Sequence, residues 1–520
     1  MAQWCIPARR QQAGKPTSAL AGSRLANGPK TRTASVTSVR KRRIIPIVSA
    51  QKQFVFAGEQ TQGNVLWMHD ASGMIEKSML FKGDAVSQEN LPSGRSSAPD
   101  LTVRNGRGVR PLRIALFGFG TVGSSVARIL SEQRPQELEL THIYNRNVAR
   151  KRVDWLPASV QWSEDVDAVL ASDADVIVEL VGGLQPPGDW MRRALEAGKS
   201  VVTANKKVIA FHGVELERLA ASRGGHIKYG AAVAGGIPVI PGIEQGLAGD
   251  RIQRIEGILN GTCNFILSQM EAGAEYATVL AVAQEKGYAE ADPTEDVGGF
   301  DARAKLAILM RLALRVEVNP EEIVPRPITD VSAVDFSYAR DLGCTIRQVA
   351  RAERTNGSVA ATVGPMLVDQ RSPLAWSRGT ENMVILSGQY GGDVVFSGHG
   401  AGGHPTAVAV VSDLLALAHG SRRVELPSEK ANVGAEFEIP HYIRFLVNDK
   451  PGIVAEITGA LARENINIRA IVQKAGFPAH ALPFVVTVEP CKSSALQRAL
   501  DSIRGMDCLL EPPLDLQMLE

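Results

Sequence analysis

The feature that most constrains this chain is an apolar segment that leads directly into a glycine-rich loop and then into a helical pattern. Leu112–Phe117 is suited to a buried strand, and apolar residues recur at helical spacing from Ser124 to Leu130. A GxGxxG loop in this strand-to-helix setting is typical of a dinucleotide-binding unit, in which the glycines permit a tight turn, close approach of a pyrophosphate and close helix–strand packing. The loop reads Gly118-Phe119-Gly120-Thr121-Val122-Gly123.

The next segments continue the pattern of alternating strands and helices. Thr141–Tyr144, Asp175–Val181 and Ser200–Thr203 are predicted strands, and Trp190–Ala197 is a predicted helix. Alternation of this kind indicates a parallel sheet with helices on both faces. We therefore predict an α/β chain whose residues 111–237 form a Rossmann-type NAD(P)-binding domain.

The choice of cofactor depends on the residues at the end of the second strand. NAD enzymes usually place a carboxylate there for the ribose hydroxyls, whereas this chain has Asn145-Arg146, with Lys151-Arg152 beyond. A guanidinium is suited to a 2′-phosphate. This pattern favours NADP, with NAD as the alternative; Arg146 could also be an ordinary solvated loop charge.

The N-terminal residues have a biased composition. Residues 1–50 contain Lys and Arg but no acid before Glu59, and they are rich in Ser, Thr and Ala. This composition is typical of an organelle transit peptide, with Ile47-Val48-Ser49-Ala50 as a cleavage site. We expect import into the plastid stroma, with the mitochondrion or a basic binding tail as alternatives. Residues 51–110 are interpreted as a linker or extension of unknown role.

Composition and charge exclude several classes of protein. The net charge is only +2, and the basic excess lies in the N-terminal segment, so the remainder does not resemble a nucleic-acid binder. No apolar run is long enough for a membrane-spanning helix. The five cysteines are scattered without zinc-site spacing, which predicts reduced thiols.

Two further domains are predicted. Residues 238–425 mix helical and extended patterns and are interpreted as an α+β catalytic and dimerisation domain, whose last helix returns to the nucleotide-binding domain. A polar linker follows at Leu426–Ala435. Residues 436–520 read strand, helix, strand, strand, helix, with a last strand expected near Cys508–Leu510. This order predicts a ferredoxin-like βαββαβ fold.

The segment from Gly287 to Lys305 combines acids with a lysine. Asp301 is at the expected start of a helix, and Lys305 is one turn later on the same face. An exposed ion pair is one interpretation. The other is a substrate site, because carboxylates can hold an ammonium group and a desolvated lysine can transfer a proton. The residues alone leave both interpretations open. The other acids of the segment are Glu290, Asp292, Glu295 and Asp296.

The segment resembles the signature of homoserine dehydrogenases, and other segments agree with that family in order between Leu112 and Leu417. The tail from Tyr442 resembles an ACT domain, and no aspartokinase segment precedes Leu112, so a monofunctional enzyme is expected. The agreeing segments are Gly118–Gly123, Val178–Gly183, Thr203–Lys207, Ala232–Pro238, Gly257–Leu267, Lys286–Pro293 and Gly400–Ala407.

The resemblance implies roles for individual residues. Lys305 would exchange the proton of the substrate oxygen, with Lys206 between nicotinamide and substrate. Glu290 would bind the substrate ammonium group, and Asp301 and Asp296 would complete the pocket. The implied cofactor contacts are Gly118, Phe119, Gly120, Thr121, Val122, Gly123, Arg146, Thr203, Lys206 and Gly402.

The resemblance also implies the reaction and the partners. The substrates would be L-homoserine and L-aspartate 4-semialdehyde, in threonine, methionine and isoleucine biosynthesis. Threonine is the expected effector of the ACT domain, and a homodimer or homotetramer is expected, with no nucleic acid or membrane as partner. A sodium ion is expected on backbone carbonyls, but where the family usually has an acid this chain has Gly230. The carbonyls would belong to Gly230, Val233, Gly235 and Ile237.

Two rival functions remain at this point. An aspartate-semialdehyde-type enzyme would use a cysteine to form a thioester, and Cys263 superficially suits that role, although a small buried core residue is the commoner use of such a cysteine. A non-catalytic amino-acid sensor is the second rival. The presence of both lysines and their acids disfavours it.

Overall fold

The fold is given by a computed structural model that describes residues 110–355, 358–420 and 429–519. These residues all belong to one unit of the chain. The predicted transit peptide (residues 1–50) lies outside the described residues, as does the predicted extension (residues 51–110) apart from its last residue. In the described part of the chain, no helix is long and apolar enough to cross a membrane.

Six strands form the first sheet, which is parallel as predicted. They are β1 (Leu112–Phe117), β2 (Leu138–Tyr144), β3 (Gln161–Ser163), β4 (Val176–Glu179), β5 (Ser200–Thr203) and β6 (Ile227–Lys228). Of these, β3 and β6 were not predicted. The strand order is β3-β2-β1-β4-β5-β6. The register pairs Phe117 with Glu179 and Glu179 with Thr203, so the last residues of three strands lie side by side at the carboxyl edge. This edge is where ligands bind in open parallel sheets.

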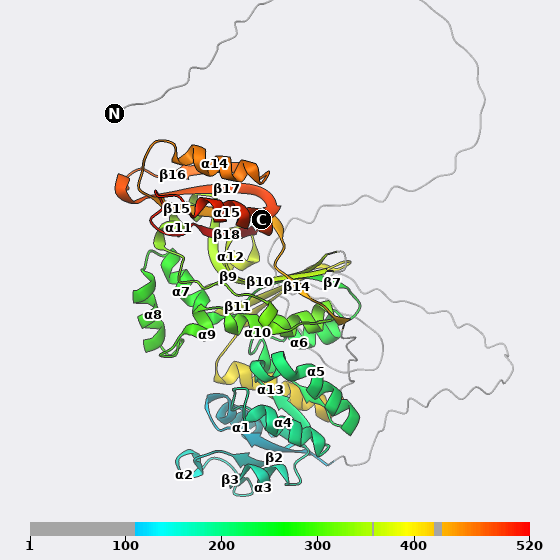
Figure 1. Ribbon diagram of the computed structural model, residues 1–520. Coiled ribbons are helices and arrows are strands. Elements are labelled where there is room, and N and C mark those ends of the chain that lie inside the picture. The colour runs from blue at the N-terminus through cyan, green and yellow to red at the C-terminus, as the bar shows by residue number, and fades with distance from the viewer. Residues whose placement is uncertain (1–109, 356–357, 421–428, 520) are drawn as a thin grey trace, which may run out of the picture. The chain divides into compact units, whose positions relative to one another are not determined.

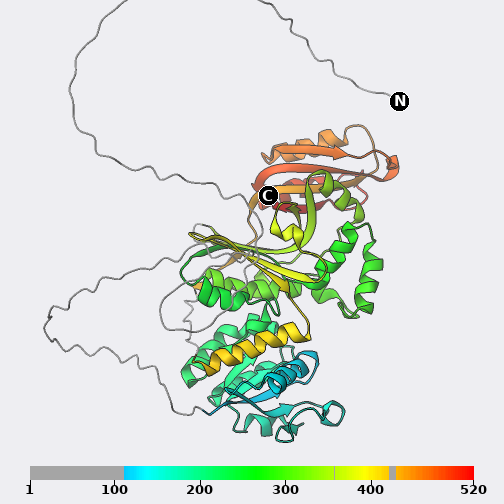
Figure 2. The same cartoon turned by 180° about the vertical axis from the view of Figure 1, so that it is seen from behind.

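Helices cover this sheet, and one of them comes from much later in the sequence. The helices are α1 (Thr121–Gln133), α2 (Val148–Lys151), α3 (Val166–Leu170), α4 (Pro187–Glu196), α5 (Lys206–Arg223) and α13 (Gly403–Ala418). Helix α13 packs against α1 and β5, and Figure 2 shows it in yellow beside the cyan α1. Val410, Val411 and Leu414 of α13 join the apolar core beneath the sheet. The chain therefore returns to the nucleotide-binding domain.

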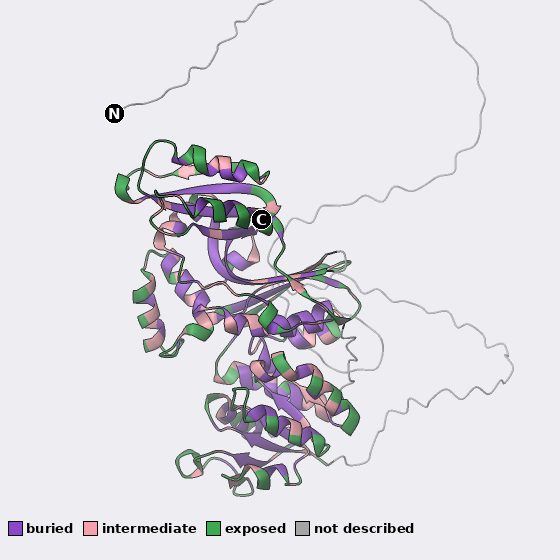
Figure 3. Ribbon diagram, in the orientation of Figure 1, coloured by how far each residue is buried: buried purple, intermediate pink, exposed green. Residues whose placement is uncertain are grey.

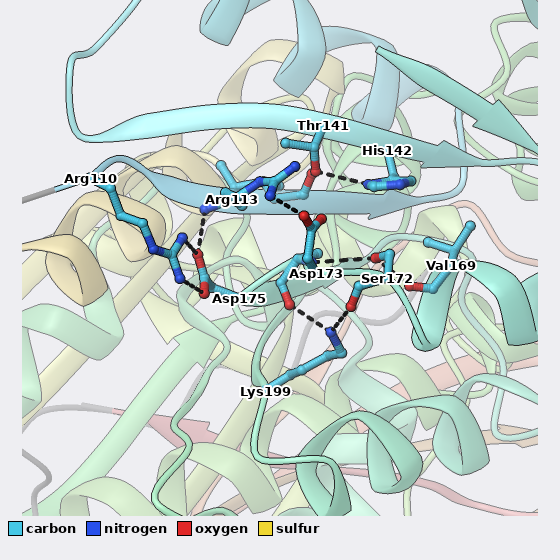
Figure 4. A network of polar contacts seen from close by, with 11 residues as sticks. Arg110, Arg113, Thr141, His142, Val169, Ser172, Asp173, Asp175 and Lys199 are labelled. Atoms are coloured by element: carbon cyan, nitrogen blue, oxygen red, sulfur yellow. Dashed lines mark hydrogen bonds and ion pairs between the residues drawn. The ribbon is translucent and has the colours of Figure 1, made fainter. Parts of the chain in front are cut away.

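A polar network closes the opposite, amino edge of the sheet (Figure 4). Asp175 accepts hydrogen bonds from both terminal nitrogens of Arg110, at 2.7 Å each, and from the backbone N–H of Arg113 at 2.8 Å. Lys199 donates to the carbonyl oxygens of Ser172 and Ala174 at 2.6 and 2.7 Å. These contacts use the polar groups at the starts of β1, β4 and β5, so this edge is structural.

The second part of the chain builds a mostly antiparallel sheet with helices packed on it. Its strands are β7 (Ile252–Ile258), β9 (Cys344–Thr355), β10 (Ser358–Asp369), β11 (Glu381–Gly388) and β12 (Gly392–His399). Its helices and helical turns are η1 (Gly230–Ala232), α6 (Val239–Pro241), η2 (Gly242–Gly246), α7 (Gly261–Glu271), α8 (Tyr276–Glu285), α9 (Thr294–Val297), α10 (Phe300–Leu309), η3 (Met310–Leu314), η4 (Pro320–Glu322), α11 (Ala333–Asp341) and α12 (Pro373–Trp376). Helices α7, α10, α11 and α12 all contact β9.

The helix expected to start at Asp301 is α10, which begins at Phe300 and is followed by the π-helical turn η3, and the single-turn α9 precedes it. The prediction for the linker needs correction. The described part of the predicted linker Leu426–Ala435 carries two short strands, because Val433 packs against the core and its neighbours join existing strands. These are β13 (Glu429–Lys430), which pairs with β8 (Val316–Glu317), and β14 (Val433–Gly434), which pairs with β10.

The C-terminal part has the predicted βαββαβ order. Its elements are β15 (Glu438–Val447), α14 (Ile453–Arg463), β16 (Ile468–Gln473), η5 (Ala479–Ala481), β17 (Leu482–Lys492), α15 (Ser493–Ile503) and β18 (Leu514–Leu519). The last strand was wrongly predicted near Cys508–Leu510, where only Leu509 forms an isolated bridge with Val447. Pro512 and Pro513 have no N–H group for a ladder, so the strand begins after them.

Strand β18 joins the antiparallel sheet of the second part and the sheet of the C-terminal part into one continuous sheet. It pairs antiparallel with β15 and parallel with β10, in the order β12-β11-β7-β9-β10-β18-β15-β17-β16 (Figure 1). Figure 3 shows that buried residues are concentrated in these strands, whereas exposed residues lie on the outer faces of the helices. The C-terminal residues Leu516 and Met518 share an apolar core with Cys263 and Ile266 of α7. The ACT-like unit is therefore built into the core around α7.

Candidate functional site

The glycine-rich loop follows β1 at the carboxyl edge of the parallel sheet. Gly118 has φ +96°, and a Cβ atom there would lie 3.0 Å from the carbonyl oxygen of Leu180. A Cβ on Gly123 would lie 2.0 Å from the carbonyl oxygen of Gly118, whereas a Cβ on Gly120 would meet nothing within 4 Å. The fold therefore requires Gly118 and Gly123, while Gly120 borders open space where a pyrophosphate can approach the backbone.

Two helices begin side by side at this loop. Helix α1 starts after Gly120 and α13 after Gly402, and neither has a side-chain cap. A Cβ on Gly403 would lie 2.9 Å from atoms of Thr121 and Ser125, so the two first turns are in close contact. Free N–H groups and the positive ends of two helix dipoles favour an anion, and the diphosphate of a dinucleotide fits this place.

A buried carboxylate organises the strand ends beside the loop. Glu179 accepts hydrogen bonds from the N–H groups of Val181 and Gly182, at 2.7 and 3.0 Å, and from the hydroxyl of Thr203 at 2.8 Å. The Thr203 hydroxyl also accepts from Asn205 N–H at 2.9 Å. The side chain of Thr203 is thus used inside the protein, so a cofactor could contact only its backbone.

Asn205 positions Lys206, the first lysine of the site. Asn205 caps α5 by accepting from Val208 N–H at 3.2 Å, and its amide donates to the Gly183 carbonyl at 2.8 Å. Lys206 is therefore the first residue of a helix whose start is anchored to the loop that follows β4. At the other end of the site Arg146 is exposed after β2, in a turn where Asn147 N–H donates to the Asn145 side chain at 3.0 Å.

The structure brings Lys206, Asp301 and Lys305 together, and we call these three residues the lysine–carboxylate cluster. Asp301 is 3% exposed in the first turn of α10. One of its oxygens lies 2.7 Å from the Lys305 Nζ, and the other forms an ion pair with Lys206. Lys305 also donates to the carbonyl oxygen of Leu259 at 2.7 Å. One carboxylate thus bridges a lysine of the nucleotide-binding domain and a lysine of the catalytic domain.

The charges of the cluster shift the pKa values of its members. Burial opposes ionisation of Asp301, but the two ammonium groups outweigh it and hold the pKa of that carboxyl well below its usual range. Burial lowers the pKa of Lys305, against the opposing effect of Asp301. Lys206 is 37% exposed, and although burial acts against its charge, Asp301 raises its pKa. Lys305 is therefore the lysine that gives up a proton more readily.

The remaining acids of the segment divide into two groups. Asp296 is next to the cluster, where Asn260 donates to it at 2.7 Å and where burial raises its pKa. Glu290 is exposed, and among the described residues its carboxylate forms no ion pair with either lysine. Asp292 accepts from Thr294 N–H at 3.1 Å, and Glu295 pairs with Lys207 at 3.0 Å. The structure thus joins Asp296 to the cluster through Asn260 and leaves Glu290 exposed.

The predicted cation loop runs through η1 into a left-handed turn at Ala234 and Gly235. Among the described residues no group of three or more His, Cys, Asp or Glu side chains is placed to hold a metal ion. The carboxylate nearest to Gly230 belongs to Asp413 of α13, which accepts the Gly230 N–H at 2.7 Å. A Cβ on Gly230 would lie 2.9 Å from that carboxylate. The other predicted carbonyl donors are the buried residues Val233, Gly235 and Ile237.

Cys263 does not have the environment of a nucleophile. It is fully buried in α7, its thiol donates to the Asp296 carbonyl oxygen at 3.1 Å, and burial raises its pKa well above the ordinary value. A reactive thiol needs a lowered pKa and access to substrate. The apolar-core interpretation is therefore favoured over a thioester mechanism.

Sequence reasoning missed three buried residues that position the site through hydrogen bonds. Glu179, Asn260 and Asp413 were not assigned a role, and each is buried. Glu179 is hydrogen-bonded to Thr203, Asn260 to Asp301, and Asp413 to Gly230. Asn260 and Asn205 could have been identified as N-cap residues, since each precedes a helical pattern. No local pattern points to Asp413, because its contact is with a residue far away in the sequence.

Comparisons with known proteins agree with this geometry. Residues 118–230 match the family described as the NAD-binding domain of homoserine dehydrogenase, and residues 238–415 match the family described as homoserine dehydrogenase. Residues 441–504 match the ACT domain family. The two catalytic matches include the glycine-rich loop and the lysine–carboxylate cluster.

Individual relatives match over nearly their whole length. The homoserine dehydrogenase of Neisseria gonorrhoeae is 34% identical over 425 residues, which cover 78% of this chain and 98% of that protein. The one from Synechocystis is 35% identical over 435 residues, with 78% and 99% covered. A crystal structure from Thiobacillus denitrificans superposes with a TM-score of 0.73 at 31% identity, covering 79% and 98%. A hyperthermophilic archaeal enzyme in complex with NADPH has a TM-score of 0.52 at 25% identity, covering 61% and 100%.

Proposed function

The chain belongs to the homoserine dehydrogenase family, and from this premise we propose that it interconverts L-homoserine and L-aspartate 4-semialdehyde in the synthesis of threonine, methionine and isoleucine. The protein is an oxidoreductase with a Rossmann-type nucleotide-binding domain. The observation that carries the proposed reaction is Asp301 held between Lys206 and Lys305, at the junction of the two domains.

The nicotinamide supplies hydride acceptance when bound, and the residues of the chain supply the proton transfer. Lys305 has three N–H donors when protonated, and two are used by Leu259 and Asp301. The third is left for the substrate oxygen. In the oxidation direction neutral Lys305 takes the hydroxyl proton, and in the reduction direction its ammonium group returns it. Lys206, the more exposed lysine, stabilises the negative charge that develops on the substrate oxygen.

The acids of the site are proposed to complete the substrate pocket, in two roles. Asp301 and Asp296 orient the lysines, and Glu290 takes the substrate ammonium group from its exposed position in the loop between α8 and α9. That arrangement requires Glu290 to approach the cluster when substrate binds. We expect the Glu290→Gln variant to raise the KM for homoserine about tenfold or more with a smaller change in kcat, because it removes ground-state binding.

The test is a direct assay of homoserine oxidation with purified protein. We expect turnover by the unaltered chain, and a loss on the order of 10²-fold or more in kcat for Lys305→Met, in line with loss of an acid–base group. Lys207→Met is the matched control, because this lysine is adjacent to Lys206 but pairs with Glu295. Absence of turnover by folded protein would refute the proposed function.

NADP is the proposed cofactor, with NAD as the weaker substrate. The support is the exposed guanidinium of Arg146 after β2, where an NAD enzyme would have a carboxylate. The ratio of kcat/KM for NADP over NAD is the measurement. Arg146→Ala should lower this ratio about tenfold or more, whereas Arg150→Ala, which changes an exposed arginine of the adjacent helix α2, should leave it unchanged.

A monovalent cation, sodium, is also proposed for the loop of Gly230, Val233, Gly235 and Ile237. The support is the pair of left-handed residues, which reverses the chain, and the carboxylate of Asp413 next to Gly230. Sodium prefers oxygen donors such as the carbonyl oxygens of this loop and the Asp413 carboxylate. Removal of sodium by exchange into a tetramethylammonium buffer should lower the thermal stability, and sodium should restore it; an unchanged Tm would argue against the site.

Threonine is proposed as the effector of the ACT domain. A cavity of about 210 Å³ borders the turn after β15, and its lining includes Asp449, Lys450, Gly452 and Gln473. A carboxylate and an ammonium group at one turn are suited to the two charged ends of an amino acid. Helix α14 begins at this turn after Gly452, which has φ +99°.

A chain of contacts leads from this domain to the catalytic loop and supports regulation. Arg326 binds the carboxylate of Asp515 on β18 at 3.4 Å. Two residues further on, Ile328 N–H donates to the Val297 carbonyl at 3.0 Å, and Val297 directly follows Asp296. A shift of β18 would therefore be transmitted to the start of the catalytic segment.

The regulatory proposal is best tested with point variants. Deletion of residues 436–520 would remove β18, the partner of Met366–Val368 in β10, and part of the core around α7. Asp449→Ala should raise the threonine concentration for half-inhibition at least tenfold while leaving uninhibited kcat unchanged. Asp507→Ala, an exposed acid of the same domain, is the control. Equal inhibition of both variants would contradict threonine binding at this turn.

Assembly and location complete the proposal. A homodimer or homotetramer is proposed from the family and from the ACT unit, and its molar mass can be measured by light scattering. Plastid import through residues 1–50 is proposed from composition alone, with the mitochondrion as the alternative. Import of the full-length chain into isolated chloroplasts and mitochondria distinguishes the two.

A further inference from the structure

Asn260 lies between β7 and α7, beside the lysine–carboxylate cluster, with its side chain in a fixed orientation. It is 4% exposed and is the N-cap of α7, where its Oδ1 accepts from Cys263 N–H at 2.8 Å. Because the helix start holds the amide oxygen, the NH₂ group must point in the opposite direction. That direction is toward the acids of the site.

The NH₂ group of Asn260 joins two carboxylates from different helices. It donates to Asp296 Oδ1 at 2.7 Å and to Asp301 Oδ2 at 2.9 Å. Two buried carboxylates so close together repel one another, and the repulsion favours protonation of one of them. A neutral amide with two donors can hold both acids without adding a third positive charge to the cluster.

The charged groups around Asp296 come from four elements. They are Asp301 and Lys305 of α10, Lys206 of α5 and the Cys263 thiol of α7, with Glu295 as a neighbour on α9. Burial raises the pKa of Asp296, the hydrogen bond from Asn260 lowers it, and Asp301 raises it further. Removal of the amide therefore shifts the protonation of Asp296 to higher pH.

Asn260 is also adjacent to the residue that holds the catalytic lysine. The Leu259 carbonyl and the Asp301 Oδ2 atom each accept a hydrogen bond from Lys305 at 2.7 Å. Asn260 donates to that same Oδ2 atom, which leaves the second oxygen of Asp301 facing Lys206. One dipeptide thus sets both the position of Lys305 and the rotation of the carboxylate that bridges the lysines.

We propose that Asn260 is a positioning residue, whose amide holds Asp296 and Asp301 as a pair so that Asp301 keeps one oxygen on each lysine. The free donor of Lys305 then stays directed at the substrate oxygen. This role rests on the proposed function, because it assumes that Lys305 exchanges the substrate proton.

The test combines kinetics with pH profiles of Asn260→Ser. We expect kcat for homoserine oxidation to fall about 10- to 100-fold, the size of a misplaced reacting group. The KM should change less than about threefold, and the acidic limb of the kcat profile should move to higher pH. If Asn260 acts through Asp296, the loss should be smaller in the Asp296→Asn background, which a double-mutant cycle measures.

Asn264→Ser is the matched control. Asn264 is a fully buried asparagine of the same helix, but its amide donates to Ser377 and Glu381 outside the cluster. Equal changes in kcat and identical pH profiles for the two variants would overturn the proposal, as would a loss for Asn260→Ser that is independent of Asp296.

A readout without turnover separates this proposal from the proposed function. The stability of Asn260→Ser relative to the unaltered chain should fall as pH rises through the pKa of Asp296, because the folded state then binds more protons than the unfolded state. A pH-independent difference in urea unfolding overturns the role of Asn260. Absence of turnover by the unaltered chain overturns the proposed function instead.

Discussion

Replacement of Asp301 by asparagine tests the electrostatic basis of the site. The carboxylate is 3% exposed and contacts two ammonium groups, of which Lys305 is 12% exposed at 2.7 Å. Removal of one partner from a buried ion pair costs about 3–5 kcal/mol, because a buried charge is left without compensation. The same change should lower kcat on the order of 10²-fold or more, since both lysines lose their anchor.

The pH dependence of this cost follows from Lys305. Asp301 raises the pKa of Lys305, and burial lowers it. Without Asp301, Lys305 avoids the cost of an unpaired buried charge by losing its proton. Release of a proton from an ordinary lysine of pKa 10.5 costs about 5 kcal/mol at pH 7 and less than about 1 kcal/mol at pH 10. The unfolded variant then binds more protons than the folded one, so the stability of the variant rises with pH. The destabilisation should shrink from about 3–5 kcal/mol at pH 7 to about 1 kcal/mol at pH 10.

Urea unfolding of Asp301→Asn and of the unaltered chain at pH 7 and pH 10 is the assay. Asp173→Asn, which breaks an exposed ion pair with Arg113, should change stability by less than about 1 kcal/mol at both pH values. A destabilisation by Asp301→Asn that is below 1 kcal/mol at pH 7, or that is equal at both pH values, would refute the argument that Asp301 compensates a buried Lys305.

Three further predictions follow from the same structure. Burial raises the pKa of Asp413 to about 7. The contribution of this carboxyl group to the stability of the fold is therefore fully present below its ordinary pKa of 3.8 and is lost as pH rises through 7. Asp413→Asn should remove about 2–3 kcal/mol of pH dependence between pH 5 and 8, measured by urea unfolding. Gly123→Ala places a Cβ 2.0 Å from the Gly118 carbonyl and should weaken NADP binding at least tenfold by fluorescence titration, whereas Gly120→Ala leaves the fold intact and weakens binding only through contact with the cofactor. Cys263→Ser should retain at least about a third of kcat, and a loss of 10³-fold would support a thioester mechanism instead.

Much of the nucleotide-binding domain could be predicted because its signals are local. Leu112–Phe117 and Ser200–Thr203 are strands with the predicted bounds, since a buried parallel strand is a continuous apolar run that ends in turn residues. The glycine spacing likewise depends on contacts within a few residues, such as Gly123 against Gly118. The resemblance to the family then added roles that spacing alone left open.

The prediction failed where distant segments decide the structure. The last strand was placed at Cys508–Leu510 instead of Leu514–Leu519, because its partners are β15 and β10, which lie far away in the sequence. The short strands β13 and β14 within the predicted linker have the same cause. A two-residue strand has no periodicity of its own, so only its partner reveals it.

The lysine–carboxylate cluster shows the same division at the site. By itself the sequence determined that Asp301 and Lys305 share a helix face and that Lys206 follows a buried strand, because one-turn spacing and apolar runs are local. Only the tertiary structure decided that Lys206 reaches the other oxygen of Asp301, that Asn260 ties Asp301 to Asp296, and that Glu290 stays exposed. The physical reason is that pKa values and ion pairs depend on distance and burial, and these are set by chain segments that meet only when the protein folds.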